Sequence, residues 1–244
     1  MKTILKKIIP NPILNELRLR KKKHLFSKKD IKETFTFIKE TDYWSSNESF
    51  SGAGSELNAT REVSVQLSKL LTKYKIKYML DIPCGDFNWM KGVNLQGVKY
   101  IGGDIVTSLI STNSHHYGNE DISFVELDIT KDQIPQMDLI FCRDCLVHFS
   151  FKDIYKALIN IKRSNSTYLL TTSFQETYEN KNIITGDWRK LNFQHWPFRL
   201  TKPIDIIDEK YTKKGNKSGD KSLCLWKIDT LNLPLILKLY YWFT

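Results

Sequence analysis

The 244-residue sequence has no apolar run that approaches the roughly 18 to 20 residues needed to cross a bilayer. Its first residues alternate lysines with short apolar pairs and then reach Pro10 and Pro12, so they lack the unbroken apolar stretch of a secretory signal. Cysteine is scarce, with four in the chain, and without a secretion signal reduced thiols are expected rather than a disulfide framework. These absences exclude a membrane-spanning protein and a small disulfide-stapled one, and they predict one cytoplasmic domain with attachments.

Acidic residues are rare at the N-terminus. Residues 1–32 hold eleven Lys or Arg against Glu16 and Asp30, which accounts for +9 of the formal net charge of +10. The basicity therefore belongs to an arm, which suits phosphate, anionic lipid or an acidic partner, and the ordinary alternative is a solvated face. Residues 231–244 are apolar and aromatic, which favours packing on the domain or on a second copy in a homo-oligomer. Peripheral membrane contact through the arm and this tail is the second interpretation.

In the middle of the chain, segments with helical spacing of apolar residues alternate with short apolar runs that are typical of strands. Apolar residues recur at helical spacing in residues 60–74 and 151–163. Strands alternating with helices predict an α/β fold with a parallel sheet that is covered on both faces. Residues 204–211 and 222–228 flank a Lys- and Gly-rich stretch, which predicts an antiparallel hairpin at the sheet edge with a mobile loop. Five short apolar runs are typical of buried strands: 78–82, 98–106, 122–129, 137–142 and 167–174.

Three successive strands of this pattern end in an aspartate, namely Asp81, Asp104 and Asp128. In an open parallel sheet, ligands bind at the carboxyl ends of the strands. Gly85 allows a tight turn and a close approach to a ligand, and Asp104 stands about twenty residues beyond the first loop, where a dinucleotide fold places the carboxylate that binds ribose. A single strand-end aspartate is as well explained as a helix cap, but three in register favour a cofactor site.

Two phosphate-binding motifs are absent, since neither G-x-G-x-x-G nor G-x-x-x-x-G-K-[ST] occurs in the sequence. Nothing then cradles a pyrophosphate or a triphosphate. A cofactor with adenosine and no phosphate, S-adenosylmethionine, fits this combination.

The succession of LDIPCGDFNWM, YIGGDIV, FVELDIT and DLIFCRDCLVHF resembles the class I S-adenosylmethionine-dependent methyltransferases. It is most similar to a bacterial subfamily with an upstream Ser/Gly segment, a D-x-P-C-G-D-F-N-W-M loop and a later G-D-W-R-x-L-N motif. The resemblance runs from about Trp44 to Ile228 and implies a Rossmann-like α/β fold, with a seven-stranded, mostly parallel sheet whose last strand is antiparallel. With the composition, it divides the chain into a basic arm or helical extension (1–40), a methyltransferase domain (41–230) and an apolar tail (231–244).

The resemblance also implies cofactor-binding residues. The first loop contacts the methionine part, the acid of the second strand binds the ribose diol, and the acid of the third accepts from the adenine amine. The family's usual first motif has two or three glycines, whereas proline, cysteine and Asp86 stand here. This difference leaves open which backbone amides face the cofactor and whether Cys84 contacts the cofactor's sulfur. The implied residues are Asp81, Pro83, Cys84, Gly85, Asp104, Ile105, Asp128 and Ile129.

The stretch after the fourth strand is the predicted catalytic segment. Methyl transfer needs positioning and, for a hydroxyl acceptor, a base. If a helix begins there, Asp144 and His148 share a face, and His148 is predicted as the general base, oriented by Asp144. The alternative is a capping aspartate and a packed histidine. Arg143 is predicted to hold the cofactor carboxylate or an anionic acceptor, or else to pair with a neighbouring acid.

Two further segments are expected to complete the pocket. Residues 44–62 are rich in Ser and Gly and lead into a helix whose N-terminus, or Arg61, suits the cofactor carboxylate; a flexible linker is the alternative. Residues 185–198 combine aromatic faces with polar groups that suit a sugar or a phosphorylated small molecule. The substrate-binding residues predicted in this segment are Asp187, Trp188, Arg189 and His195.

Cys142 and Cys145 form a C-x-x-C pair, but a zinc site needs a second such pair or a suitably spaced histidine pair. We therefore expect no metal.

The resemblance implies O-methylation of a small molecule or glycan in bacterial capsule or surface-polysaccharide biosynthesis, at a sugar or a phosphoramidate substituent, because the relatives that this chain resembles often belong to such pathways. One alternative is an RNA or protein methyltransferase that uses the basic arm, although C-R-D-C stands where methylation of an exocyclic nitrogen requires N/D-P-P-Y/F, so nucleic acid is not the expected partner. The other is a scaffold that keeps the fold without catalysis.

Overall fold

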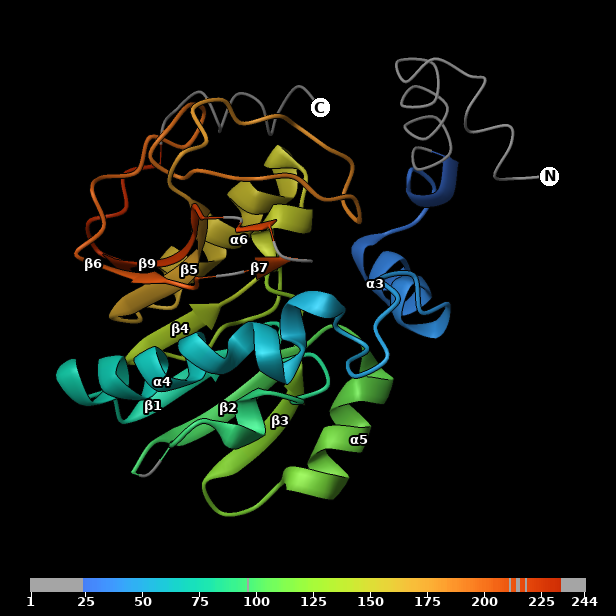
Figure 1. Ribbon diagram of the computed structural model, residues 1–244, viewed down its shortest axis with the longest axis vertical. Helices are drawn as coiled ribbons and strands as arrows, with labels where there is room; N and C mark the ends of the chain where they lie inside the picture. Colours follow the sequence, from blue (N-terminus) through green and yellow to red (C-terminus); the bar gives the residue numbers. More distant parts are fainter. Residues whose placement is uncertain (1–23, 96, 211, 214–215, 218, 234–244) are drawn as a thin grey trace.

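Seven strands form one sheet in the order β3-β2-β1-β4-β5-β9-β6. The computed structural model describes residues 24–95, 97–210, 212–213, 216–217 and 219–233. Six strands run in one direction, and β9, which lies between β5 and β6, runs antiparallel to both (Figure 1). This is the predicted α/β methyltransferase fold. The strands are β1 (Tyr78–Asp81), β2 (Lys99–Asp104), β3 (Ile122–Glu126), β4 (Leu139–Cys142), β5 (Tyr168–Phe174), β6 (Asp205–Asp208) and β9 (Lys221–Lys227).

The point where the strand order reverses lies between β1 and β4. β1 is flanked by β2 on one side and by β4 on the other, with Asp81 opposite Gly102 and Phe141. Because the connections leave in opposite directions here, the carboxyl ends of β1, β2 and β4 border a crevice. All the loops that carry the predicted cofactor residues open into it.

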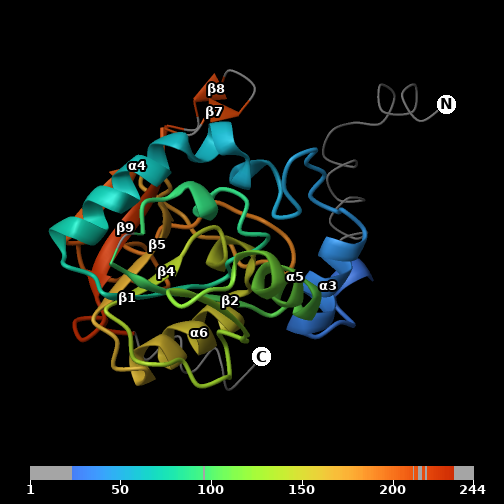
Figure 2. The same ribbon diagram turned by 90° about the horizontal axis from the view of Figure 1, so that it is seen from below.

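Helices α4 (Leu57–Lys73) and α6 (Phe151–Arg163) cover opposite faces of the sheet, as Figure 2 shows. Val63 and Leu67 of α4 pack in one apolar cluster with β-strand residues, and Ile154 and Leu158 of α6 pack in the other. Ser150 caps α6 by accepting a hydrogen bond from the amide of Asp153. Both helices confirm the predicted periodicity.

Helix α3 (Ile31–Glu40) belongs to the stretch expected to be an arm or a helical extension. Asp30 and Glu33 form a reciprocal capping box at its start. Lys32 pairs with Glu126 at the end of β3, and Phe35 contacts the ring of Phe149 at 5.7 Å between centroids. These contacts place α3 at the edge of the sheet where the crevice opens, next to α5 (Thr107–Tyr117) (Figures 1 and 2).

The predicted edge hairpin is confirmed by β6 and β9. Between them lie the two-residue strands β7 (Thr212–Lys213) and β8 (Asn216–Lys217). The mobility predicted for this loop rests partly on residues outside the described ones, as do the predictions for residues 1–23 and 234–244. In the described part of the chain, no helix has the length and apolar character that a bilayer crossing requires.

Candidate active site

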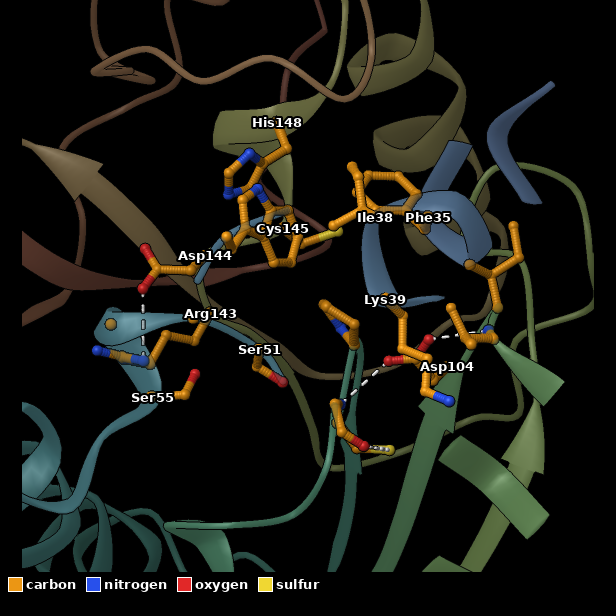
Figure 3. A pocket seen from close by; sticks show the side chains of 18 of the residues that line it. Phe35, Ile38, Lys39, Ser51, Ser55, Asp104, Arg143, Asp144, Cys145 and His148 are labelled. Atoms are coloured by element: carbon orange, nitrogen blue, oxygen red, sulfur yellow. Dashed lines mark hydrogen bonds and ion pairs between the residues drawn. The ribbon is translucent and has the colours of Figure 1, made fainter. Parts of the chain in front are cut away.

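A pocket of about 490 Å³ opens at the carboxyl ends of β1, β2 and β4. Its size falls in the range of about 300 to 1,000 Å³ that is typical of small-molecule and cofactor sites. The walls come from the three strand ends, from α3, from the segment 51–55 and from the loop at 186–188. Figure 3 shows Asp104 and Lys39 toward one end of the pocket, and Asp144 and His148 toward the other.

Gly85 carries the turn after β1. Its φ of +56° lies in the left-handed region, and a Cβ at this position would overlap the hydroxyl of Ser51. The amide of Gly85 donates to Oδ2 of Asp104 at 3.0 Å, and its carbonyl accepts from Nδ2 of Asn113 at 2.8 Å. The sequence places glycine where both the backbone angle and the neighbouring chain require it.

Asp104 ends β2 with both carboxylate oxygens held by the backbone. Oδ1 accepts from the amide of Val106 at 2.9 Å, while Oδ2 accepts from Gly85. Burial raises the pKa of Asp104 to about 6, and the two amides counteract part of this shift. Near neutral pH the group is therefore mainly a carboxylate, fixed at the pocket wall beside Ile105.

Asp81 ends β1 in a different environment. Its Oδ2 accepts from the hydroxyl of Tyr100 at 2.7 Å, and burial raises its pKa to about 8. Asp81 lines the pocket together with Pro83 and Cys84. Burial also raises the pKa of the Cys84 thiol well above its ordinary value, so this sulfur stays protonated.

Asp128 and Ile129 lie at the pocket wall beyond β3. Oδ1 of Asp128 accepts from the amide and the hydroxyl of Thr130, at 2.9 and 2.7 Å. Oδ2 lies 3.5 Å from Nζ of Lys131. Asp128 thus stabilises the turn that follows it and also borders the pocket. Both a local capping role and a place in the cofactor site are therefore compatible with its position.

Arg143 lines the pocket, but its guanidinium is paired with an acid of the chain. Nε and Nη2 donate to the two carboxylate oxygens of Glu209, at 3.2 and 2.7 Å. The guanidinium also lies over the ring of Trp89, at 5.4 Å from its centroid. Of the predictions for Arg143, pairing with an acid is the one the structure shows, and it stabilises the crevice wall.

The prediction that Asp144 orients His148 is wrong. Asp144 adopts a left-handed φ of +53°, and only the short turn Leu146–His148 follows, so no helix places the two side chains on one face. Oδ2 of Asp144 instead accepts from Nζ of Lys221 at 2.5 Å and lies 3.4 Å from Nη1 of Arg143. Although burial opposes ionisation, these two cations hold the pKa of Asp144 at about 2.

His148 is oriented by a backbone carbonyl. Its Nδ1 lies 2.8 Å from the carbonyl oxygen of Asp187, and its ring contacts that of Trp44 at 4.7 Å between centroids. Because a carbonyl can only accept, Nδ1 carries the proton and Nε2 carries the lone pair. Burial lowers the pKa of His148 to about 4, so the imidazole is neutral at physiological pH and can accept a proton at Nε2.

Of the predicted substrate residues, Asp187 and Trp188 line the pocket. Arg189 does not: Nη1 and Nη2 donate to the carbonyls of Leu146 and Phe149, at 2.9 and 2.7 Å, which supports the turn that carries His148. His195 also lies outside the pocket, against the ring of Tyr178. The predictions that Arg189 and His195 bind the substrate are therefore corrected, because both side chains contact other loop residues instead of lining the pocket.

The Ser/Gly segment contributes through residues 51–55 rather than through Arg61, which is exposed and outside the pocket. Asp86 ties the segment to the β1 loop by accepting from the hydroxyl of Ser49 and the amide of Phe50, at 3.0 and 2.8 Å. The segment therefore lines the pocket as predicted, but Arg61 is not one of the lining residues.

Sequence reasoning missed several pocket residues. The charge pattern groups α3 with the basic arm, although its apolar spacing is that of an amphipathic helix. The Lys- and Gly-rich composition predicts a mobile loop at Lys221, but this residue begins β9, and a lone lysine next to a Gly-rich loop gives no signal of burial. The residues missed in this way are Ile31, Phe35, Ile38, Lys39 and Lys221.

All four cysteines are free and buried. In the described part of the chain, no group of three or more His, Cys, Asp or Glu is arranged to hold a metal ion.

Residues 80–166 match a family described as a methyltransferase domain. This part of the chain is similar to known methyltransferase domains. No curated protein matches the chain. The domain match and the fold together support an S-adenosylmethionine-dependent methyltransferase. The match begins at Leu80 in β1 and extends past the end of α6, so it includes the strand ends that line the pocket.

Three solved structures show the same fold. One, described as PigF with SAH, is 16% identical with a TM-score of 0.51 and covers 69% of this chain and 55% of its own. The methyltransferase domain of bacterial CtHen1 is 11% identical with a TM-score of 0.51, covering 70% and 100%. The N-methyltransferase NodS from Bradyrhizobium japonicum is 14% identical with a TM-score of 0.50, covering 70% and 96%. At these identities the likeness concerns the fold.

Proposed function

We propose that this protein transfers the methyl group of S-adenosylmethionine to a hydroxyl of a small molecule or glycan, in the cytoplasmic assembly of a bacterial surface polysaccharide. The observation that carries the proposal is the fixed carboxylate of Asp104 at the end of β2, within a pocket formed at the switch point of a methyltransferase fold.

The residues of the pocket fit the cofactor. An ionised carboxylate accepts hydrogen bonds from a ribose diol, and Asp104 is held for this by two amides. Ile105, Leu127 and Ile129 give apolar contact for an adenine ring. The close approach of Gly85 to Ser51 leaves the β1 loop no room for a side chain there. When bound, S-adenosylmethionine would supply an electrophilic methyl group for the transfer.

His148 is the base of the proposed reaction. Its Nε2 would take the proton from the acceptor hydroxyl as the oxygen bonds to the methyl carbon and the bond from that carbon to sulfur breaks, which leaves S-adenosylhomocysteine. The neutral imidazole is available over the physiological pH range because burial lowers its pKa to about 4. Trp44 on one face and the carbonyl of Asp187 at Nδ1 limit its rotation, which aids catalysis by positioning.

The acceptor end of the pocket is aromatic. Trp188, which lines the pocket with 51% of its surface exposed, follows Asp187, whose carbonyl holds His148, and Trp44 lies beside the His148 ring. Exposed aromatic rings next to hydrogen-bonding groups suit the apolar faces and hydroxyls of a sugar. This supports a glycan or sugar acceptor over a purely apolar one.

The test is methyl transfer from labelled S-adenosylmethionine to nucleotide sugars and capsule precursors, with Asp104→Ala and His148→Ala as inactive references. Transfer to a sugar hydroxyl supports the proposal. Transfer to RNA or protein instead, lost when residues 1–23 are deleted, supports the alternative that uses the basic arm. The deletion ends before residue 24 because α3 begins at Ile31, which lines the pocket.

A further inference from the structure

Two hydrogen-bond acceptors at the catalytic end of the pocket have no partner among the described residues. These atoms are Oδ1 of Asp144 and Nε2 of His148, whose other polar side-chain atoms are both engaged. Both residues line the pocket, and Figure 3 shows their side chains at the same end of it. A ligand that fills this end must satisfy both atoms, since an unpaired buried polar group is costly.

The carboxylate of Asp144 is fixed in position and in charge. Lys221 and Arg143 contact Oδ2 at 2.5 and 3.4 Å, and the amide of Asp144 donates to the hydroxyl of Thr172 at 2.8 Å. These contacts keep the group ionised, so Oδ1 can only accept.

The charges around Asp144 do not form an anion site. Lys221 lies 3.1 Å from Glu209 as well as 2.5 Å from Asp144, and Arg143 binds Glu209 with two donors. Two cations thus face two carboxylates in a buried and electrically balanced cluster. A phosphate or carboxylate on the acceptor would be repelled by the carboxylate of Asp144, and the cluster has no uncompensated positive charge to attract it.

We propose that Asp144 determines acceptor specificity, because Oδ1 receives a second hydroxyl of the acceptor next to the hydroxyl that His148 deprotonates. The acceptor is then a vicinal diol, as in neighbouring hydroxyls of a pyranose. This inference rests on the proposed function and narrows its acceptor. A site built to bind a hydroxyl discriminates strongly against an analogue that lacks it, because the site's own polar group is left unpaired.

The experiment compares the effect of removing one sugar hydroxyl in the wild-type protein with its effect in Asp144→Ala. Methyl α-D-glucopyranoside and its monodeoxy analogues are offered with labelled S-adenosylmethionine, and the position of the methyl group in the product identifies the neighbouring hydroxyl. In the wild-type protein, removal of that hydroxyl should lower kcat/KM by roughly tenfold or more. In Asp144→Ala the same removal should change nothing, since its partner is already gone.

Asp205→Ala is the matched control. Asp205 also pairs with a lysine, Lys73, at 2.7 Å, and its side chain is 25% exposed, as that of Asp144 is. Asp205 lies on β6, outside the pocket, so its variant should keep the wild-type dependence on the neighbouring hydroxyl. Asp144→Leu, which keeps a similar side-chain size but has no hydrogen-bond acceptor, carries the same comparison if Asp144→Ala does not fold.

Equal loss of activity with the deoxy sugar in wild type and in Asp144→Ala overturns the inference, as does transfer to none of the glycosides. A fall in S-adenosylhomocysteine affinity in Asp144→Ala also overturns it, because Asp144 would then bind the cofactor's ammonium group. Calorimetry on the wild-type protein separates the two proposals: absence of S-adenosylhomocysteine binding means that the proposed function itself has failed.

Discussion

Nδ1 of His148 donates to the carbonyl oxygen of Asp187 across 2.8 Å, although the two residues are 39 positions apart in the chain. This one bond decides which nitrogen of the ring is basic. It also joins the turn after β4 to the loop after β5, which presents Trp188 to the pocket. The proposed base and the proposed acceptor surface are therefore held by the same segment.

Replacing His148 by alanine should lower kcat by roughly 10²- to 10⁴-fold, the usual contribution of a general base. The dissociation constant for S-adenosylhomocysteine should stay within about twofold, because His148 lies at the far end of the pocket from Asp104. Steady-state kinetics and calorimetry measure the two quantities. His195→Ala, outside the pocket, is the control and should keep full activity; full activity in His148→Ala would remove it from the mechanism.

The pH dependence follows from the same ring. His148 must be neutral to act as a base, and its pKa is lowered from 6.5 to about 4. With saturating cofactor, kcat/KM for the acceptor should stay level from neutral pH down to about pH 5 and fall only near pH 4. The neutral form is favoured by folding, so its contribution to stability is complete above pH 6.5 and is lost as the pH falls toward 4. A fall in kcat/KM centred near pH 6.5 would show that the pKa of His148 is not lowered by burial.

Much of this site could be predicted from sequence because parallel strands end at one edge of the sheet. Asp81, Asp104 and Asp128 follow apolar runs, and a regular fold brings such strand ends together. Asp144 could not be placed this way, since its side-chain direction depends on a left-handed backbone angle that spacing does not reveal. Its true partner, Lys221, comes from the opposite end of the domain sequence through β9, next to β5.

The errors at Arg189 and His195 have another cause. Both stand in a segment correctly expected at the pocket, but loops need internal hydrogen bonds because their backbone groups lack regular partners. Arg189 supplies two of these bonds to the turn before α6. Composition shows that a loop is rich in polar groups, but not which of them face inward to hold the loop together.

Asp104→Asn should weaken S-adenosylhomocysteine binding by roughly 10- to 100-fold, because it removes charge-assisted hydrogen bonds to the ribose. Wild-type affinity should also fall as the pH is lowered through about 6, where Asp104 becomes protonated. Calorimetry at several pH values measures both effects. Asp205→Asn on β6 is the control, and an unchanged affinity in Asp104→Asn would exclude Asp104 from the cofactor site.

Gly85→Ala should reduce both stability and cofactor affinity. The left-handed backbone angle costs an alanine about 1 kcal/mol or more, and the added Cβ overlaps the Ser51 hydroxyl. Urea unfolding and calorimetry measure the two losses. Ser51→Gly in the same chain should restore part of the stability, because it removes the overlap and leaves only the strain; no recovery would show that the crowding at Ser51 is not the cause.

Every role proposed for this pocket depends on its binding S-adenosylmethionine, which titration calorimetry of the purified protein with S-adenosylmethionine and S-adenosylhomocysteine measures. We expect one site for each ligand, with dissociation constants on the order of micromolar, and weaker binding of both in Asp104→Asn. No binding at millimolar ligand would refute the cofactor site and would favour a scaffold that keeps the fold without the cofactor.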